Sequence, residues 1–272
     1  MWTAAIDIVT GKSVYAPFEL VHASYAAPSF DHGAFHATTN GLASGNDYAE
    51  AVAHALYETI ERDAVTLWSL GDLAARAAHR LDLDSVACAQ CRRLIAAFDR
   101  AQVEIAVWDV TSDIAVASFL ALCADRAGAW TDPEVGSGCH PCRDVALFRA
   151  LSEAAQARAT FISGARDDFE ARDYASSARA RRLETSRDWM EGSAQTVFAD
   201  APTIERDSVR DDLIEVASRL ARVGLTQILA VDLTHPALQI PVARVLVPGL
   251  EGVYGGPDYA PGRRAASLLA RS

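Results

Sequence analysis

The 272-residue sequence lacks any apolar run near the ~20 residues that a membrane-spanning helix needs. Basic residues are also in the minority, since 25 lysines and arginines stand against 36 aspartates and glutamates, for a net charge of −11. Such an acidic chain lacks the general basic surface that binds nucleic acid. The amino-terminal residues show no basic stretch followed by an apolar core, so we expect no secretory signal and a cytoplasmic location. We therefore predict no nucleic-acid partner and no membrane partner.

Lysine itself is nearly absent, with Lys12 as the only one, which indicates a composition bias and carries no mechanism. Half of the residues are hydrophobic, so the chain can bury a sizeable core and is not intrinsically disordered. Strand-like runs alternate with helical patterns, which predicts an α/β fold. The strand-like runs are 4–9, 103–110, 116–123, 227–233 and 242–247, and the helical patterns are 48–68, 85–101, 144–163 and 208–223.

Cysteine is scarce, and four of the five cysteines form two C-x-x-C pairs, Cys88 with Cys91 and Cys139 with Cys142. The gap between the pairs is long for a zinc ribbon, although a zinc site stays open as a less favoured alternative. Cys88 and Cys91 fall in a helical pattern, where they can pack as small hydrophobic residues. A redox role for Cys139 and Cys142 is a further, weaker alternative.

The most informative stretch is the glycine-rich turn 38–47, followed by a helical pattern that carries Glu50, Glu58 and Glu61. Their offsets place the three carboxylates on one face, where they repel each other unless a cation or ligand is present. Mg²⁺ suits such oxygen ligands and bridges them to phosphates, and the turn offers an anion the positive end of the helix dipole. The pattern indicates a magnesium–nucleotide site. The alternative is a solvated face on which Arg62 pairs with Glu58 at i,i+4.

Three segments, taken together and in this order, resemble the conserved blocks of YcaO-domain proteins. The first is the turn and helix just described, the second is a glycine-rich segment with the helix after it, and the third is a strand and turn near the carboxyl end. They comprise Asn40–Asn46, Glu50-Ala51 and Glu58–Asp63; Gly136–Pro141, Ala150–Arg158 and Gly164–Asp168; and Pro241–Glu251.

The resemblance implies an α/β fold with a mixed sheet and flanking helices, forming a single YcaO-like domain over residues 1–272. It also implies that ATP and Mg²⁺ are cofactors and that a peptide is the substrate. Many YcaO proteins phosphorylate a peptide-bond oxygen. The activated carbon is then attacked by a Cys, Ser or Thr side chain, which gives an azoline, or by sulfide, which gives a thioamide.

Site residues follow from the same resemblance, position by position, while the catalytic residues stay unassigned. Arg244 has an additional reason of its own, because it interrupts an apolar strand and a buried charge needs a partner. We expect that partner to be a nucleotide phosphate or a carboxylate such as Glu251. The expected nucleotide contacts are Asn46, Glu50, Arg62, Gln156 and Arg244, and the expected magnesium ligands are Glu50, Glu58 and Glu61.

The sequence also departs from the family pattern. Few residues precede Thr38, and no paired-carboxylate helix lies among them, so the chain resembles an amino-truncated YcaO protein that binds ATP weakly alone. The carboxyl end lacks a proline-rich tail, which favours a thioamide-forming or otherwise non-azoline member. A TfuA-like or other partner protein is a further expectation. The alternative function is a non-catalytic remnant or assembly subunit that needs a partner to bind ATP. Homo-oligomers are compatible with either function.

Overall fold

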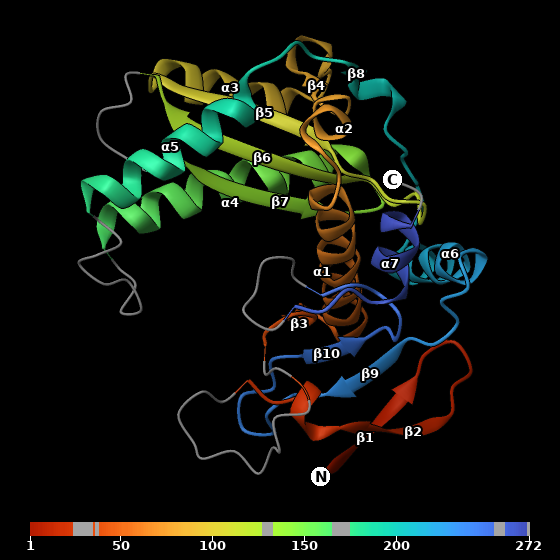
Figure 1. Ribbon diagram of the computed structural model, residues 1–272. Coiled ribbons are helices and arrows are strands. Elements are labelled where there is room, and N and C mark those ends of the chain that lie inside the picture. The colour runs from red at the N-terminus through yellow and green to blue at the C-terminus, as the bar shows by residue number, and fades with distance from the viewer. Residues whose placement is uncertain (24–34, 36–37, 127–132, 165–174, 253–258, 271–272) are drawn as a thin grey trace. The chain divides into compact units, whose positions relative to one another are not determined.

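The computed structural model describes the chain except for residues 24–34, 36–37, 127–132, 165–174, 253–258 and 271–272 (Figure 1). The chain divides into two compact units, a first unit of residues 1–67 and 205–272 and a second unit of residues 68–204. Each unit contains sheets and helices, as the α/β interpretation expects. That the two units act as a single YcaO-like domain stays a prediction.

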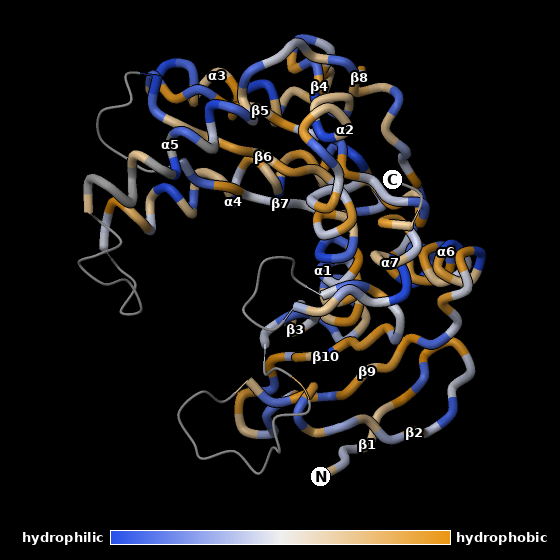
Figure 2. Tube along the Cα trace, viewed as in Figure 1, coloured by the Kyte–Doolittle hydropathy of each residue, from blue (hydrophilic) through white to orange (hydrophobic). Residues whose placement is uncertain are grey.

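The first unit contains a five-stranded antiparallel sheet in the order β2-β1-β9-β10-β3. One face carries a small apolar cluster of Ala5, Ala16, Val21 and Val231. Figure 2 shows the hydrophobic character of β9, the central strand, and of its neighbour β10. The strands are β1 (Trp2–Asp7), β2 (Ser13–Pro17), β3 (Leu42–Ser44), β9 (Leu229–Asp232) and β10 (Val242–Leu246).

Two long helices of the first unit agree closely with the sequence patterns. Helix α1 (Tyr48–Ser69) buries Ala51, Ala55 and Ile60 completely, as the apolar stripe of an amphipathic helix does. Helix α6 (Val209–Arg222) begins after Ser208, whose side chain accepts a hydrogen bond from the Asp211 N–H. The carboxyl-terminal helix is α7 (Arg263–Leu269), and a short 3-10 helix, η1, covers Phe18–Leu20.

The second unit is built on the three-stranded antiparallel sheet β5-β6-β7. Strand β6 is buried on both faces, because α3 and α4 cover one side and α5 contacts the other (Figure 1). Strands β4 and β8 add a short parallel pair. The elements are α2 (Leu73–Ala77), β4 (Leu81–Asp82), η2 (Leu83–Ser85), α3 (Ala89–Arg100), β5 (Val103–Asp109), β6 (Ser118–Asp125), β7 (Glu134–Cys139), α4 (Arg143–Ser163), α5 (Ser176–Met190), β8 (Thr196–Val197) and η3 (Phe198–Asp200).

Helix α5 is the main difference from the sequence-based expectation. From its sequence, the Arg- and Asp-rich segment 166–187 is expected to be an exposed, flexible connection. Residues 166–174 lie outside the described part of the chain, and residues 176–190 form helix α5. Its tryptophan explains the difference, because Trp189 packs edge-on against Trp68 and Trp108 with ring centroids 5.6 and 6.3 Å away. Tertiary packing of one aromatic residue thus orders a segment whose other residues are mainly polar. Across the described residues, no helix is long and apolar enough to cross a membrane.

Helix α4 lies unusually close to β7, because both contact surfaces consist of very small residues. Ala146, Ala150 and Ala154 recur every four residues along the helix and are fully buried. A Cβ atom added at Gly138 would lie 2.2 Å from the Ala146 carbonyl oxygen, and one at Gly136 would lie 2.1 Å from the Ala154 nitrogen. These glycines therefore set the distance between the helix and the sheet.

We predict that Gly138→Ala lowers the free energy of unfolding by about 2 kcal/mol, because the new methyl group meets backbone atoms that cannot rotate away. Denaturant unfolding followed by circular dichroism measures the change. Gly252→Ala is the matched control, since a Cβ atom there meets nothing within 4 Å. Equal stabilities of the two variants would contradict the close helix–sheet packing.

Candidate functional site

The turn before α1 is fixed at Gly41, which has a positive φ of 76°. The Gly41 N–H donates to Oε2 of Glu58 at 3.1 Å, and its carbonyl accepts from the Val245 N–H at 2.8 Å. A Cβ atom at this position would lie 2.4 Å from the Val245 carbonyl oxygen, so both the backbone angle and the space require glycine. The turn, β10 and α1 therefore meet at one residue, and Glu58 is oriented by it.

Asn46 and Glu50 form a pair at the beginning of α1. Oε2 of Glu50 accepts hydrogen bonds from the backbone N–H and the side-chain amide of Asn46, at 2.9 and 2.8 Å. The Glu50 N–H in turn donates to Oδ1 of Asp47 at 2.9 Å, as in a helix capping box. The structure thus brings these two predicted site residues together, in an exposed position where they also cap the helix.

Glu58, Glu61 and Arg62 form a second group two turns further along the helix. Arg62 Nη2 lies 3.7 Å from Oε1 of Glu58 and 3.9 Å from Oε1 of Glu61. Glu61 is only 4% exposed, although it is a carboxylate. The side chains of Glu58 and Arg62 are 22% and 31% exposed, so Glu61 is the buried member of this group.

Glu50 does not share one ion position with the other two glutamates. Eight residues separate it from Glu58, and a rise of about 1.5 Å per residue places it roughly 12 Å away along the helix axis. Among the described residues, no group of three or more His, Cys, Asp or Glu side chains is arranged to hold a metal ion. The zinc alternative thus gains no support from the described residues.

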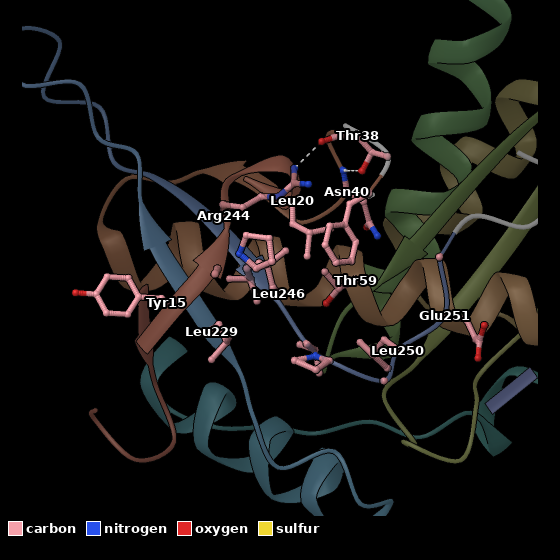
Figure 3. Close-up of a pocket in the computed structure, with 18 residues that line it drawn as sticks. Tyr15, Leu20, Thr38, Asn40, Thr59, Leu229, Arg244, Leu246, Leu250 and Glu251 are labelled. Atoms are coloured by element: carbon pink, nitrogen blue, oxygen red, sulfur yellow. Dashed lines mark hydrogen bonds between the residues drawn. The ribbon is translucent and has the colours of Figure 1, made fainter. Parts of the chain in front are cut away.

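Arg244 lies on β10 and is 2% exposed, as expected for a charge in an apolar strand. Its Nη1 donates to the carbonyl oxygen of Thr38 at 2.8 Å. Arg244 therefore contacts the start of the turn, and Glu58 contacts the end of the same turn at Gly41. Figure 3 shows Arg244 in a pocket of about 450 Å³, together with Thr38, Asn40 and Thr59. Oδ1 of Asn40 is buried there and accepts no hydrogen bond within the described part of the chain. The pocket therefore combines apolar walls with a cation and an available acceptor.

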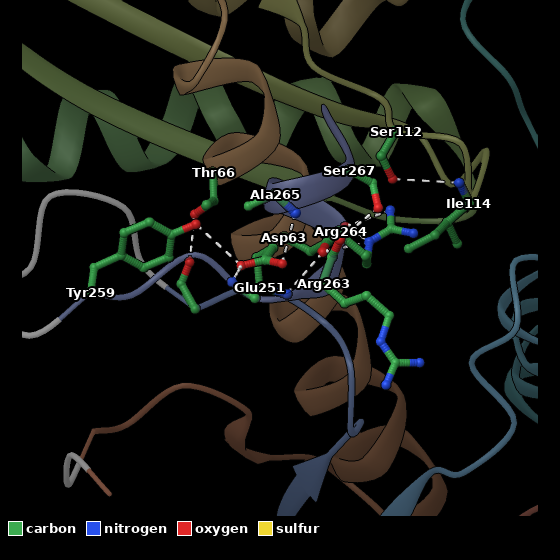
Figure 4. Close-up of polar contacts among 12 residues, drawn as sticks. Asp63, Thr66, Ser112, Ile114, Glu251, Tyr259, Arg263, Arg264, Ala265 and Ser267 are labelled. Carbon is green, nitrogen blue, oxygen red and sulfur yellow. Dashed lines mark hydrogen bonds and ion pairs between the residues drawn. The ribbon is translucent and has the colours of Figure 1, made fainter. Parts of the chain in front are cut away.

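Glu251, the carboxylate that we expected as one possible partner of Arg244, has a different environment. Its carboxylate accepts hydrogen bonds from the backbone N–H groups of Gly262 and Ala265, both at 2.9 Å, at the start of α7 (Figure 4). Tyr259 adds a hydroxyl donor at 3.1 Å. A carboxylate at the amino end of a helix also interacts favourably with the helix dipole. Glu251 therefore anchors α7.

Asp63 belongs to the same hydrogen-bond network, and no local sequence pattern indicates this role. It is completely buried on α1, where it accepts a hydrogen bond from the Glu251 N–H at 2.9 Å and a forked pair from Arg264 at 2.9 and 3.0 Å. Arg264 lies 201 residues along the chain from Asp63, so no local pattern links them. Asp63 directly follows Glu61 and Arg62, and its anchoring therefore fixes the part of α1 that carries them.

Gln156 belongs to the second unit, where it is exposed on α4. Its neighbour Glu153 accepts hydrogen bonds from the backbone N–H and the hydroxyl of Ser137, at 2.7 and 3.2 Å, and so links α4 to β7. These hydrogen bonds give Glu153 a structural role in joining α4 to β7. That Gln156 contacts the nucleotide stays a prediction.

A model of the YcaO family, described as a YcaO cyclodehydratase that binds ATP and Mg²⁺, matches residues 1–251. The chain belongs to the YcaO family. The family resemblance of the three sequence blocks is therefore confirmed.

Two curated YcaO relatives are similar along nearly the whole chain. An uncharacterised protein from the tfuA 3′ region of Rhizobium leguminosarum bv. trifolii is 34% identical over 277 residues, which is 98% of this chain and 65% of the relative. An uncharacterised protein of Methanothermobacter thermautotrophicus is 34% identical over 275 residues, covering 98% of this chain and 70% of that protein. The chain thus spans about two thirds of the length of these relatives.

Solved YcaO structures share the fold. YcaO from Methanopyrus kandleri bound with AMPPCP and Mg²⁺ is 27% identical, with a TM-score of 0.70 over 96% of this chain and 69% of that chain. The heterocyclase TruD is 24% identical, with a TM-score of 0.75 over 96% of this chain and 36% of that chain. These similarities confirm the predicted α/β architecture with sheets and flanking helices.

We predict that Arg264→Ala lowers the free energy of unfolding by about 3 kcal/mol, because it leaves the buried Asp63 carboxylate without its guanidinium partner. Chemical denaturation measures the loss. The neighbouring exposed residue provides the control, since Arg263→Ala should change stability by less than about 0.5 kcal/mol. Similar effects of the two substitutions would contradict the anchoring role of Asp63.

Proposed function

We propose that this chain binds ATP with Mg²⁺ through its first unit and activates a peptide backbone amide by phosphorylation. The observation that carries the proposal is the group of Glu58, Glu61 and Arg62, which lies in the matched YcaO region and is fixed by Gly41 and Asp63. The family description and the nucleotide-bound relative support the same cofactors.

Glu58 and Glu61 are the proposed magnesium ligands. They lie three residues apart on one helix face, so both carboxylates can reach one ion. Carboxylate oxygens are the ligands that Mg²⁺ prefers. When bound, the ion would neutralise phosphate oxygens and so lower the barrier to phosphoryl transfer. Glu50, with Asn46, would contact another part of the nucleotide or a separate ion.

Arg62 and Arg244 are the proposed partners of the phosphates. Arg62 lies beside both carboxylates, and Arg244 contributes a buried guanidinium to the pocket wall. A guanidinium binds phosphate oxygens in a fixed geometry and stays charged at every physiological pH. Gln156 remains a candidate contact that rests on the family resemblance.

The proposed phosphorylation converts the amide oxygen into a better leaving group. An amide carbon is a poor electrophile because its oxygen leaves poorly, whereas a phosphorylated oxygen departs as phosphate. Transfer of the terminal phosphoryl group of ATP to the amide oxygen would release ADP, and a nucleophile would then displace phosphate. Sulfide would give a thioamide, and a Cys, Ser or Thr side chain would give an azoline.

The thioamide is the favoured product, with a TfuA-like protein as the partner. The support is the Rhizobium relative from the tfuA 3′ region, which is 34% identical to this chain. The Rhizobium relative is longer than this chain. Substrate choice and partner binding are therefore proposed for this chain together with its partner proteins, and not for the chain alone.

We predict that the double substitution Glu58→Gln and Glu61→Gln abolishes Mg²⁺-dependent ATP binding. A glutamine at position 58 keeps an oxygen that accepts the Gly41 N–H, so the fold is retained and only the charge is lost. Calorimetric titration with Mg-ATP measures the effect, and exposed Glu205→Gln is the control. Unchanged affinity in the folded double variant would exclude this metal assignment, and a wild-type chain that binds no Mg-ATP would favour the non-catalytic alternative.

We also predict that the chain, or a complex that contains it, forms a backbone thioamide while it cleaves ATP. Mass spectrometry of a treated peptide distinguishes the routes, because a thioamide exchanges one oxygen for sulfur whereas an azoline loses one water. A stable phosphopeptide or a ligated amino acid would instead indicate kinase or ligase chemistry.

A further inference from the structure

The first turn of α3 in the second unit carries two cysteines that the proposed function does not use. Cys88 is the residue that caps the helix, and Cys91 is the third residue within it. Side chains at these two positions face each other across the first helical turn. Helix geometry places their Cα atoms about 5 Å apart, inside the range of roughly 4.4–6.8 Å that a disulfide requires.

The two thiols have unequal environments. Cys88 is partly exposed, whereas Cys91 is fully buried in the core between α3 and α4. Burial raises the pKa of the Cys91 thiol, and the nearby Cys88 thiol raises this pKa further. The two thiols donate to different acceptors: Cys88 donates to Oε1 of Gln90 at 3.5 Å, and Cys91 donates to the Asp144 carbonyl oxygen in the first turn of α4 at 3.4 Å.

Cys123 provides a comparison, because it is a buried cysteine without such a neighbouring thiol. It is also buried, and burial raises its pKa to about 11, with no thiol among the causes. Packing as a small hydrophobic residue explains Cys123. It does not explain why a partly exposed thiol lies one helical turn from the buried thiol of Cys91.

We propose that Cys88 and Cys91 are a redox-active dithiol that closes to a disulfide by exchange with a low-molecular-weight disulfide. The Cys88 thiolate attacks one sulfur of the external disulfide, forms a mixed disulfide and releases one thiolate. Cys91 then loses its proton and attacks the Cys88 sulfur, which releases the second external thiol. In sum, the two cysteines lose two electrons and two protons, and the external disulfide gains them.

This assignment differs from the weaker alternative raised by the sequence, a redox role for Cys139 and Cys142. Cys142 caps α4, but Cys139 precedes it in β7, so the two do not occupy opposite ends of one helical turn. Closure of the Cys88–Cys91 bridge also removes the donor to Asp144. Oxidation of the two cysteines of α3 would therefore break a hydrogen bond to the first turn of α4.

The test uses the full chain in mixtures of reduced and oxidised glutathione, quenched with acid, alkylated and mapped by mass spectrometry. We expect the peptide that contains both cysteines to lose two hydrogens and to lose alkylation at Cys88 and Cys91, and dithiothreitol should restore both. Cys88→Ser and Cys91→Ser should each abolish the bridge. The double variant Cys139→Ser and Cys142→Ser is the control and should form it at the same glutathione ratio as the wild type.

Wild-type protein decides the question even if a variant fails to fold. A Cys88 thiol that stays fully alkylated in every native glutathione mixture would overturn the proposal. An equal loss of hydrogens in the Cys88→Ser variant would overturn it too, because the bridge would then join other cysteines. Neither result would bear on the proposed magnesium ligands Glu58 and Glu61, which belong to the first unit.

Discussion

The hydrogen bond between the Gly41 N–H and the Glu58 carboxylate is the contact on which the candidate site depends. It joins the turn before β3 to α1, while the Gly41 carbonyl joins the same turn to β10. Because the approach is too close for any Cβ atom, the three segments cannot slide past one another. One oxygen of Glu58 is thereby oriented toward the turn, and its other oxygen faces Arg62. A site that selects a metal and a phosphate needs this kind of rigid support.

Helix α1 carries buried carboxylates, and each is stabilised in a different way. Asp63 receives a forked guanidinium from Arg264 and a backbone N–H, so its charge is satisfied within the protein. Glu61 is also buried, and it lies near Arg62 together with Glu58, at longer distances. Asp63 is therefore the carboxylate that anchors the helix, whereas Glu58 and Glu61 are the carboxylates proposed to bind a cation.

Local sequence patterns predicted the long helices well and the connections poorly. The helical pattern 48–68 corresponds to α1, Tyr48–Ser69, because its apolar stripe reports burial directly. Strand β7 and helix α5 gave no such signal. Glycines in β7 allow close packing against α4, and the described contacts of α5 include the packing of Trp189 against Trp68 and Trp108 and the hydrogen bond from Arg80 to the Met190 carbonyl oxygen. In both elements, packing partners outweigh intrinsic preference.

Local sequence patterns are enough to predict α1 and the spacing of its glutamates, because these depend on residues within a few turns of one another. The family follows from the sequence too, through three blocks spread between Asn40 and Glu251. The sequence also places Arg244 in an apolar strand, where a charge needs a partner. The fold identifies the Thr38 carbonyl oxygen, 206 residues away, as an acceptor for Arg244, and it reveals the pairing of Asp63 with Arg264. Such contacts arise when distant segments pack together, and the energetic need to pair a buried charge does not specify which distant residue meets it.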